Sequence, residues 1–279
     1  MPVRIVTDST CDLPRQLAEQ YGITVVPLIV LFGDEALRDG VDIDGPTFYE
    51  RLKVSRDLPR TSQPSVETFR EAYEALAADT NEIVSIHVSS KLSGTLNSAS
   101  IARDQVSHEL HIELVDSYNV SVGLGAIVLE AAAAANAGAS MAEVVEVTRK
   151  AMDRVYWVAF LDTLEYLQRG GRIGKARSLV GSILSIKPLL HCEDGEIAPF
   201  ERVRTRTKAV ERLFEIATQD GTIKRLIVAA AGNEDEAVAF MERLRPVLPH
   251  TEFLLGQLGP VVGVHAGPGA LGVCMVRRD

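Results

Sequence analysis

Short apolar segments alternate with longer amphipathic segments through the first half of the chain. The apolar segments are rich in β-branched residues, which is typical of buried strands. The predicted strands span 3–7, 23–32, 83–88 and 112–116. The predicted helices between and after them span 13–21, 46–55, 66–79, 94–107 and 123–137. This alternation indicates a mostly parallel sheet with helices on both faces.

Capping residues predict where two of these helices start. Asp12 is the predicted N-cap of the first helix, with Pro14 in its first turn and Gly22 just beyond its end. Ser65 is the predicted N-cap of the helix that follows it. Each of these side chains can accept a hydrogen bond from an N–H group that a first helical turn leaves without a partner.

The pattern changes in the second half of the chain. A helix over 140–154 is followed by shorter and less regular segments. Strands are predicted at 155–161, 186–192, 197–202, 226–231, 253–255 and 272–277, and helices at 163–169, 176–184, 207–218 and 234–244. Asp194-Gly195 is a dipeptide typical of a tight hairpin turn between two strands.

We therefore predict an α/β fold with two domains. The N-terminal domain, residues 1–150, holds a mostly parallel sheet with helices on both faces. The C-terminal domain, residues 151–279, is mixed α/β, and the helix 140–154 connects the two.

Composition narrows the function classes. The chain has 279 residues, 46% of them hydrophobic, and a net charge of −9. An acidic balance argues against a general surface for nucleic acid or anionic membranes. No apolar run approaches the roughly 18 residues of a spanning helix, so we expect no transmembrane segment. The three cysteines lie far apart without a CxxC pair, which favours a reducing cytoplasm.

Hydroxyl side chains gather where predicted strands end. The richest loop is Ser89-Ser90-Lys91-Leu92-Ser93-Gly94-Thr95, and the other polar loops are 7–10, 61–65 and 116–121. One cap per helix explains one such residue in each loop. The surplus indicates an anion bound at a helix start near the carboxyl ends of the strands. Because Lys91 is the one cation in these loops, a carboxyl group fits better than a polyphosphate.

Other motifs fail on spacing or context. Residues 170–176 lack the spacing and the final Ser or Thr of a phosphate-binding loop, and 267–272 match a dinucleotide pattern with no helix to follow. His108 and His111 have the wrong spacing for two zinc ligands on one helical face. We therefore expect no metal and no cofactor.

Two alternatives stay open at the level of the residues. One is a serine hydrolase, with Ser93 as nucleophile, His265 as base and Asp8 or Asp116 as the orienting acid. No GxSxG segment supports it. The other is a binder of small phosphorylated metabolites at the same helix starts, which the scarcity of cations disfavours.

The ordered motifs resemble those of the DegV family over essentially the whole chain. The similar segments are Thr7–Pro14, Thr61–Ser65, Ser89–Thr95, Asp116–Gly125, Leu164–Ile173 and His265–Gly269. The resemblance implies a non-enzymatic carrier of a long-chain fatty acid such as palmitate, with a role in lipid transport and fatty acid metabolism. Its partner would be a separate fatty acid kinase that phosphorylates the bound carboxyl group to an acyl phosphate. A transient contact with a membrane stays open.

The resemblance also implies roles for particular residues. Thr61, Ser93 and His265 would bind the fatty acid carboxyl group, and the C-terminal domain would help enclose the lipid. Arg172 and Arg204 would face the kinase or the phosphate. The polar loops would support the site through Asp8, Ser9, Thr95, Ser117 and Asn119.

Overall fold

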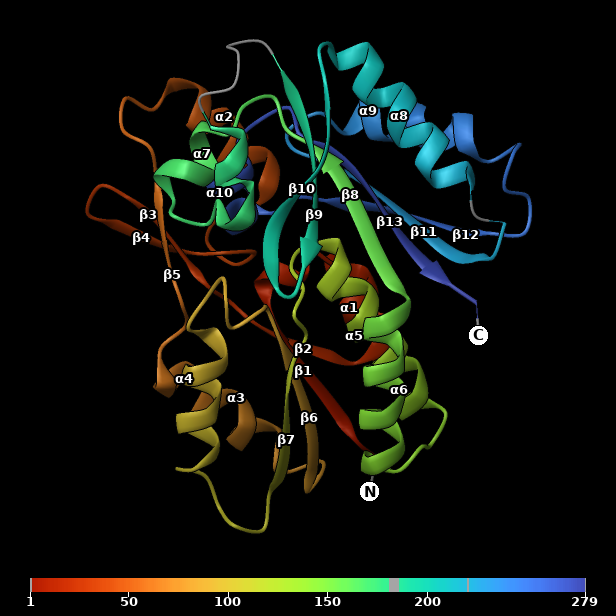
Figure 1. Ribbon diagram of the computed structural model, residues 1–279. Helices are drawn as coiled ribbons and strands as arrows, with labels where there is room; N and C mark the ends of the chain where they lie inside the picture. The colour runs from red at the N-terminus through yellow and green to blue at the C-terminus, as the bar shows by residue number, and fades with distance from the viewer. Residues whose placement is uncertain (1, 181–185, 220, 279) are drawn as a thin grey trace.

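The protein, described here from a computed structural model, contains a parallel sheet and a mixed sheet that lie one above the other in Figure 1. The structure describes residues 2–180, 186–219 and 221–278. The parallel sheet has the strand order β2-β1-β6-β7. Its strands are β1 (Arg4–Asp8), β2 (Ile23–Val26), β6 (Glu82–His87) and β7 (His111–Asp116).

Helices cover both faces of the parallel sheet, as the strand–helix alternation predicts. One face packs against α3 (Val66–Leu76) and α4 (Thr95–Arg103). The opposite face packs against α1 (Arg15–Tyr21), α5 (Val122–Asn136) and α6 (Met141–Arg154). Figure 1 shows the two groups of helices on opposite sides of the strands.

The mixed sheet has six strands in the order β10-β9-β8-β13-β11-β12, and only β11 and β12 pair in parallel. Its strands are β8 (Val155–Phe160), β9 (Lys187–Glu193), β10 (Glu196–Val203), β11 (Ile223–Ala230), β12 (Glu252–Gln257) and β13 (Leu271–Arg277). Helices α8 (Arg206–Gln219) and α9 (Glu234–Leu244) pack on one face. The hairpin turn at Asp194-Gly195 is confirmed, with both residues at positive φ.

The prediction of one strand over 23–32 is wrong. The segment is divided at Pro27, which has no N–H group to continue the ladder. Its second half, β3 (Ile29–Phe32), joins a third sheet with β4 (Glu35–Arg38) and β5 (Arg60–Ser62). This third sheet brings the Thr61 loop beside the carboxyl end of the parallel sheet.

The predicted N-cap role of Asp12 is also wrong. Asp12 adopts a left-handed conformation at φ 51° and closes the 3₁₀ helix η1 (Ser9–Cys11). Helix α1 starts later, with Pro14 at its N-cap position. Ser65 does cap α3, because its side chain accepts a hydrogen bond from the Thr68 N–H.

Three short helices complete the architecture around the loops. They are α2 (Gly45–Val54), α7 (Glu165–Arg169) and α10 (Pro260–Ala266), of which α10 is not predicted from the sequence. The predicted helix 176–184 is in part the 3₁₀ helix η2 (Gly174–Leu179), and residues 181–184 lie outside the described residues.

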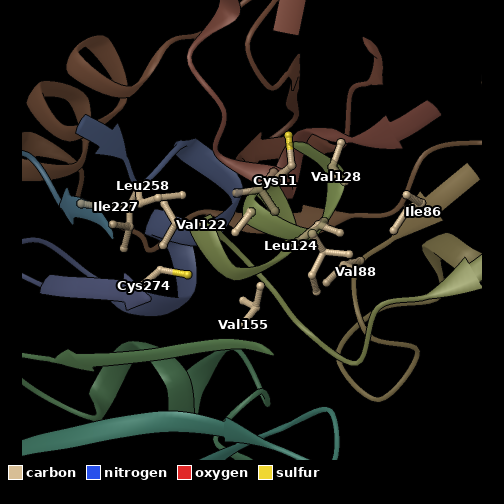
Figure 2. Packing of buried hydrophobic residues seen from close by; sticks show 14 of the residues in the cluster. Cys11, Ile86, Val88, Val122, Leu124, Val128, Val155, Ile227, Leu258 and Cys274 are labelled. Atoms are coloured by element: carbon tan, nitrogen blue, oxygen red, sulfur yellow. The ribbon is translucent and has the colours of Figure 1, made fainter. Parts of the chain in front are cut away.

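One hydrophobic cluster extends through both halves of the chain. Helix α5 packs against β1 of the parallel sheet and against β8 and β13 of the mixed sheet. Figure 2 shows Cys11 and Val88 from the first half in the same cluster as Ile227 and Cys274 from the second. A division near residue 150 stays a prediction. Among the described residues, no helix is long and apolar enough to cross a membrane.

Candidate functional site

A cavity of about 350 Å³ lies between the loops of the parallel sheet and one face of the mixed sheet. Most of its lining is aliphatic, which is typical of a site for an apolar ligand. The apolar lining includes Leu28, Val88, Leu92, Val120, Val122, Trp157, Ala159, Leu161, Leu167, Leu190, Ile197, Leu258, Val261 and Val262. The polar lining is Thr10, Thr61, Ser62, Gln63, Ser93, Ser121, Arg172 and His265.

The three residues expected to bind a carboxyl group all line this one cavity. Thr61 comes from β5, Ser93 from the loop before α4, and His265 from α10. Thr61 Oγ1 and His265 Nε2 are 2.9 Å apart and share a hydrogen bond. The fold therefore joins residues that are 204 positions apart in the chain.

His265 is electrically neutral at neutral pH. Burial, aided by the nearby Arg172 guanidinium, lowers the pKa of His265 to about 4. Its Nδ1 atom is buried without a hydrogen-bond partner among the described residues. A methyl group at Gly170 would lie 2.1 Å from Nδ1, so only glycine fits beside the ring. The Nδ1 atom is thus packed against the Gly170 backbone, while Nε2 contacts the Thr61 hydroxyl.

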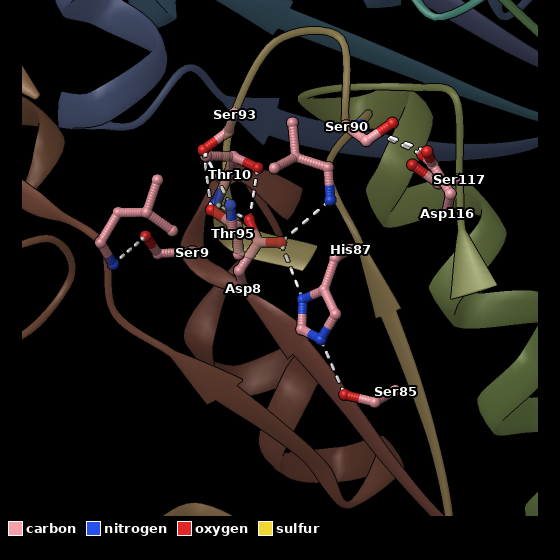
Figure 3. Close-up of polar contacts among 12 residues, drawn as sticks. Asp8, Ser9, Thr10, Ser85, His87, Ser90, Ser93, Thr95, Asp116 and Ser117 are labelled. Carbon is pink, nitrogen blue, oxygen red and sulfur yellow. Dashed lines mark hydrogen bonds and ion pairs between the residues drawn. The ribbon is translucent and has the colours of Figure 1, made fainter. Parts of the chain in front are cut away.

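Ser93 is held at the start of α4. Its hydroxyl lies 2.8 Å from the Thr95 hydroxyl and accepts a hydrogen bond from the Thr95 N–H. Figure 3 shows Ser93 and Thr95 beside Thr10, another residue of the cavity lining. The predicted supporting position of Thr95 is thus next to Ser93.

Gln63 links the Thr61 loop to the Ser93 loop. Its amide donates to the Ser98 hydroxyl in α4 at 2.8 Å. A methyl group at Gly94 would lie 2.0 Å from Gln63 Oε1, so the two loops pack closely. Gln63 lies within the family-like segment Thr61–Ser65, yet no role was predicted for it, because a glutamine in a polar loop carries no distinctive local signal.

Asp8 and Ser9 lie where β1 ends and the first polar loop begins. Asp8 is fully buried and accepts hydrogen bonds from Thr10, from His87 Nδ1 and from the Val88 N–H. The chain of contacts continues from His87 to the Ser85 hydroxyl at 2.7 Å (Figure 3). Ser9 accepts a hydrogen bond from the Leu28 N–H. Asp8 therefore fixes the ends of β1 and β6, from which two cavity loops start.

Hydrogen bonds link Ser117 to Asn119 and Asn119 to Trp157. Ser117 Oγ accepts a hydrogen bond from the Asn119 N–H, and Asn119 Oδ1 accepts one from the Trp157 indole at 2.8 Å. Trp157 lines the cavity and is the single tryptophan of the sequence. A methyl group at Gly123 would lie 2.6 Å from the Trp157 ring, so the start of α5 must approach the indole closely.

The two predicted kinase-facing arginines differ in their surroundings. Arg172 is half-buried in the cavity lining and donates to the carbonyl oxygens of Leu92 and Gly170. Arg204 is exposed in the bend between β10 and α8 and does not line the cavity. Only Arg172 therefore lies beside the predicted carboxyl position.

The described residues do not assemble a hydrolase triad. His265 Nε2 contacts the Thr61 hydroxyl rather than Ser93, and Asp8 contacts His87. Asp116 accepts hydrogen bonds from the N–H groups of Ser90 and Tyr118. Within residues 2–180, 186–219 and 221–278, no three His, Cys, Asp or Glu side chains come together as metal ligands would.

Comparison with known proteins identifies the family. The model described as "Uncharacterised protein, DegV family" matches residues 2–278. The chain belongs to the DegV family. It is 38% identical to Protein DegV of Bacillus subtilis, over 98% of this chain and 99% of that protein.

Solved DegV structures share the fold. The crystal structure of Bacillus subtilis DegV, described as a fatty acid binding protein, superposes with a TM-score of 0.90 at 36% identity over the whole of both chains. A DegV family protein from Thermus thermophilus, described by its fatty acid binding, gives 0.91 at 33% identity, also over both complete chains. The mixed α/β fold is thus confirmed as that of the DegV family.

Proposed function

We propose that this DegV family chain binds a long-chain fatty acid, with its carboxyl group at Thr61, Ser93 and His265. The observation that carries the proposal is the cavity itself, which is aliphatic along most of its lining and polar where Thr61 contacts His265, with Ser93 also in the lining. The fatty acid binding described for the Bacillus subtilis and Thermus thermophilus relatives supports it.

The energetics favour a long hydrocarbon chain. Each buried methylene contributes about 0.8 kcal/mol. A carboxyl group buried without partners costs a few kcal/mol. Hydroxyl groups of Thr61 and Ser93 and the neutral ring of His265 supply such partners without adding a fixed charge. A chain of many methylenes therefore outweighs the cost of removing one carboxyl group from water.

The experiment is mass spectrometry of lipids extracted from the protein after expression in a heterologous host. We expect about one long-chain fatty acid per chain, and we expect palmitate to bind to the delipidated protein in calorimetry. Purified protein with no fatty acid and no heat of palmitate binding would refute the proposal. Turnover of a generic ester, abolished in Ser93→Ala, would instead support the hydrolase.

We further propose that the chain is a carrier that presents the bound carboxyl group to a separate fatty acid kinase. The half-buried Arg172 lies in the cavity lining, where a phosphate formed on the carboxyl group would meet its guanidinium. Arg204 is exposed and lies outside the cavity lining, so its side chain is accessible to a protein partner. Both assignments rest on the family resemblance as well as on these positions.

Kinase assays can separate presentation from binding. With a fatty acid kinase and ATP, Arg204→Ala is expected to lower the rate of acyl phosphate formation while the Kd for palmitate stays unchanged. Lys208→Ala, another exposed cation nearby in the chain, is the control. Equal rates for both variants would exclude Arg204 from the partner surface.

A further inference from the structure

Ser121 is a polar residue among apolar residues of the cavity lining. It follows β7 and comes just before α5. Its sequence neighbours Val120 and Val122 line the same cavity, as do Leu258 and Val261 at the start of α10. A hydrocarbon chain forms no hydrogen bond with a hydroxyl group. Binding of an alkyl tail therefore does not explain a serine at this position.

The Ser121 hydroxyl is held by a buried acid. It donates a hydrogen bond to Asp12 Oδ2 at 2.5 Å, and Asp12 Oδ1 accepts one from the Gly259 N–H at 2.9 Å. Figure 2 shows the adjacent residues Val122 and Leu258 in one apolar cluster. The hydrogen of the Ser121 hydroxyl is thus directed at Asp12, and the lone pairs of its oxygen remain to accept a hydrogen bond.

The backbone of Ser121 has a conformation that favours glycine. Its φ is 58° and its ψ is −142°, where side chains other than that of glycine are rarely found. Strain of this kind persists where the surrounding structure holds the residue in place, and it is concentrated at ligand sites. The hydrogen bond to Asp12 supplies that hold. A serine in place of glycine here indicates a use for its hydroxyl group.

Helix α10 indicates how far Ser121 lies from the polar end of the cavity. Asp12 joins Ser121 to Gly259, the N-cap of α10, and His265 lies in the last turn of that helix. Val261 and His265 both line the cavity, so the helix runs along its wall. At about 1.5 Å per residue, Gly259 and His265 are about 9 Å apart along the helix. An extended hydrocarbon chain with bonds of about 1.5 Å covers this distance with about seven carbons.

We propose that Ser121 binds a hydroxyl group near the middle of the ligand chain, so that the cavity takes long-chain fatty acids hydroxylated at a mid-chain carbon. This inference rests on the proposed function. The ligand hydroxyl donates to Ser121 Oγ, whose own hydrogen is directed at Asp12. A plain hydrocarbon chain also fits, because Ser121 keeps its hydrogen bond to Asp12 when the ligand has no hydroxyl group.

The test compares the Kd values of stearate and 9-hydroxystearate in calorimetry of the delipidated protein. The wild type is expected to bind 9-hydroxystearate at least as tightly as stearate. In Ser121→Ala the buried hydroxyl group of the ligand loses its partner, so its Kd is expected to rise about tenfold relative to that of stearate. Ser107→Ala, which removes an exposed hydroxyl between α4 and β7, is the control and is expected to keep the wild-type ratio. For 17-hydroxystearate, whose hydroxyl lies beyond Ser121, the ratio is expected to be the same in the wild type and in Ser121→Ala.

The ratio of the two Kd values separates contact with the ligand from a structural role. A structural disturbance at Ser121 changes both Kd values together and leaves their ratio unchanged. An unchanged ratio in Ser121→Ala overturns the inference, as does weaker binding of 9-hydroxystearate than of stearate by the wild type. If Ser121→Ala does not fold, Ser121→Gly decides, because glycine adopts φ 58° without strain and lacks the hydroxyl group. Absence of stearate binding by the wild type overturns the proposed function instead.

Discussion

The cavity at Ala159 is expected to limit the length of the hydrocarbon chain that binds. Ala159 lies in β8, inside a sheet with packing on both faces, yet it is partly exposed because the cavity lies against it. It pairs with Gly272 of β13, which also lines the cavity. A methyl group at Gly272 would lie 2.7 Å from Ala159 Cβ. Ala159→Leu is therefore expected to fill this part of the cavity.

The expected loss follows from the number of carbons added. Leucine has three more side-chain carbons than alanine, and these take the place of about three methylenes of the ligand. At about 0.8 kcal/mol for each buried methylene, palmitate loses about 2.4 kcal/mol of binding free energy. That corresponds to about a 60-fold increase in Kd. Tridecanoate, which is shorter by three carbons, does not need the filled region and is expected to keep its Kd.

Isothermal titration calorimetry of the delipidated protein with both acids measures this difference. Ala239→Leu, the same substitution on the exposed face of α9, is the control and is expected to change neither Kd. The melting temperature of ligand-free Ala159→Leu is expected to be unchanged or higher, because the leucine fills empty space. Equal losses for palmitate and tridecanoate, or no loss for either, would refute the reasoning.

Three further predictions concern the polar end of the cavity and the hairpin tip. Thr61→Val leaves a buried polar group unpaired at a cost of about 1–3 kcal/mol, so the Kd for palmitate is expected to rise about 5- to 150-fold in calorimetry; a Kd near that of the wild type would contradict a role of Thr61 in holding the carboxyl group. Gly195→Ala places a methyl group 2.4 Å from Ser89 Oγ at φ 79°, whereas Gly33→Ala meets open space at φ 61°. Urea denaturation is therefore expected to show a larger loss for Gly195→Ala, and equal losses would mean that the tip is loosely packed. Because the folded-state pKa of His265 is about 4 and its ordinary value is 6.5, the unfolded chain takes up the proton first, and stability is lost as the pH falls from 6.5 toward 4. Denaturation of His265→Asn over this range is expected to show a flatter loss, and an unchanged slope would exclude the histidine as its source.

Local signals were sufficient for most helices and strands. Ser65 caps α3 as its position before an amphipathic segment predicts, and Ser140 starts α6 with a capping box to Glu143. The Asp194-Gly195 turn forms the predicted hairpin. Such signals act within a few residues, so they can be read from the sequence without knowing the rest of the fold.

Two elements depended on distant packing. The segment 23–32 is divided between two sheets, although both halves have the same apolar character. Helix α10 contains valines and Gly263, which are poor helix formers, and it is stabilised by contact with α2. A methyl group at Gly263 would lie 2.7 Å from the Phe48 ring, so this glycine is required by the approach of the two helices.

The candidate site, like the fold, depends partly on local sequence signals and partly on distant packing. The hydroxyl-rich loops predicted Thr61 and Ser93 as site residues, because a surplus of polar side chains at strand ends is visible along the chain. The carboxyl-binding role of His265 was predicted only from the family resemblance. The cavity between them is different: it exists where Ala159 and Gly272 leave space in neighbouring strands of the mixed sheet. A small residue carries no local mark of the empty volume beside it. Both the cavity volume and the contact between Thr61 and His265 depend on tertiary structure, because each needs segments that are distant in the chain to pack together.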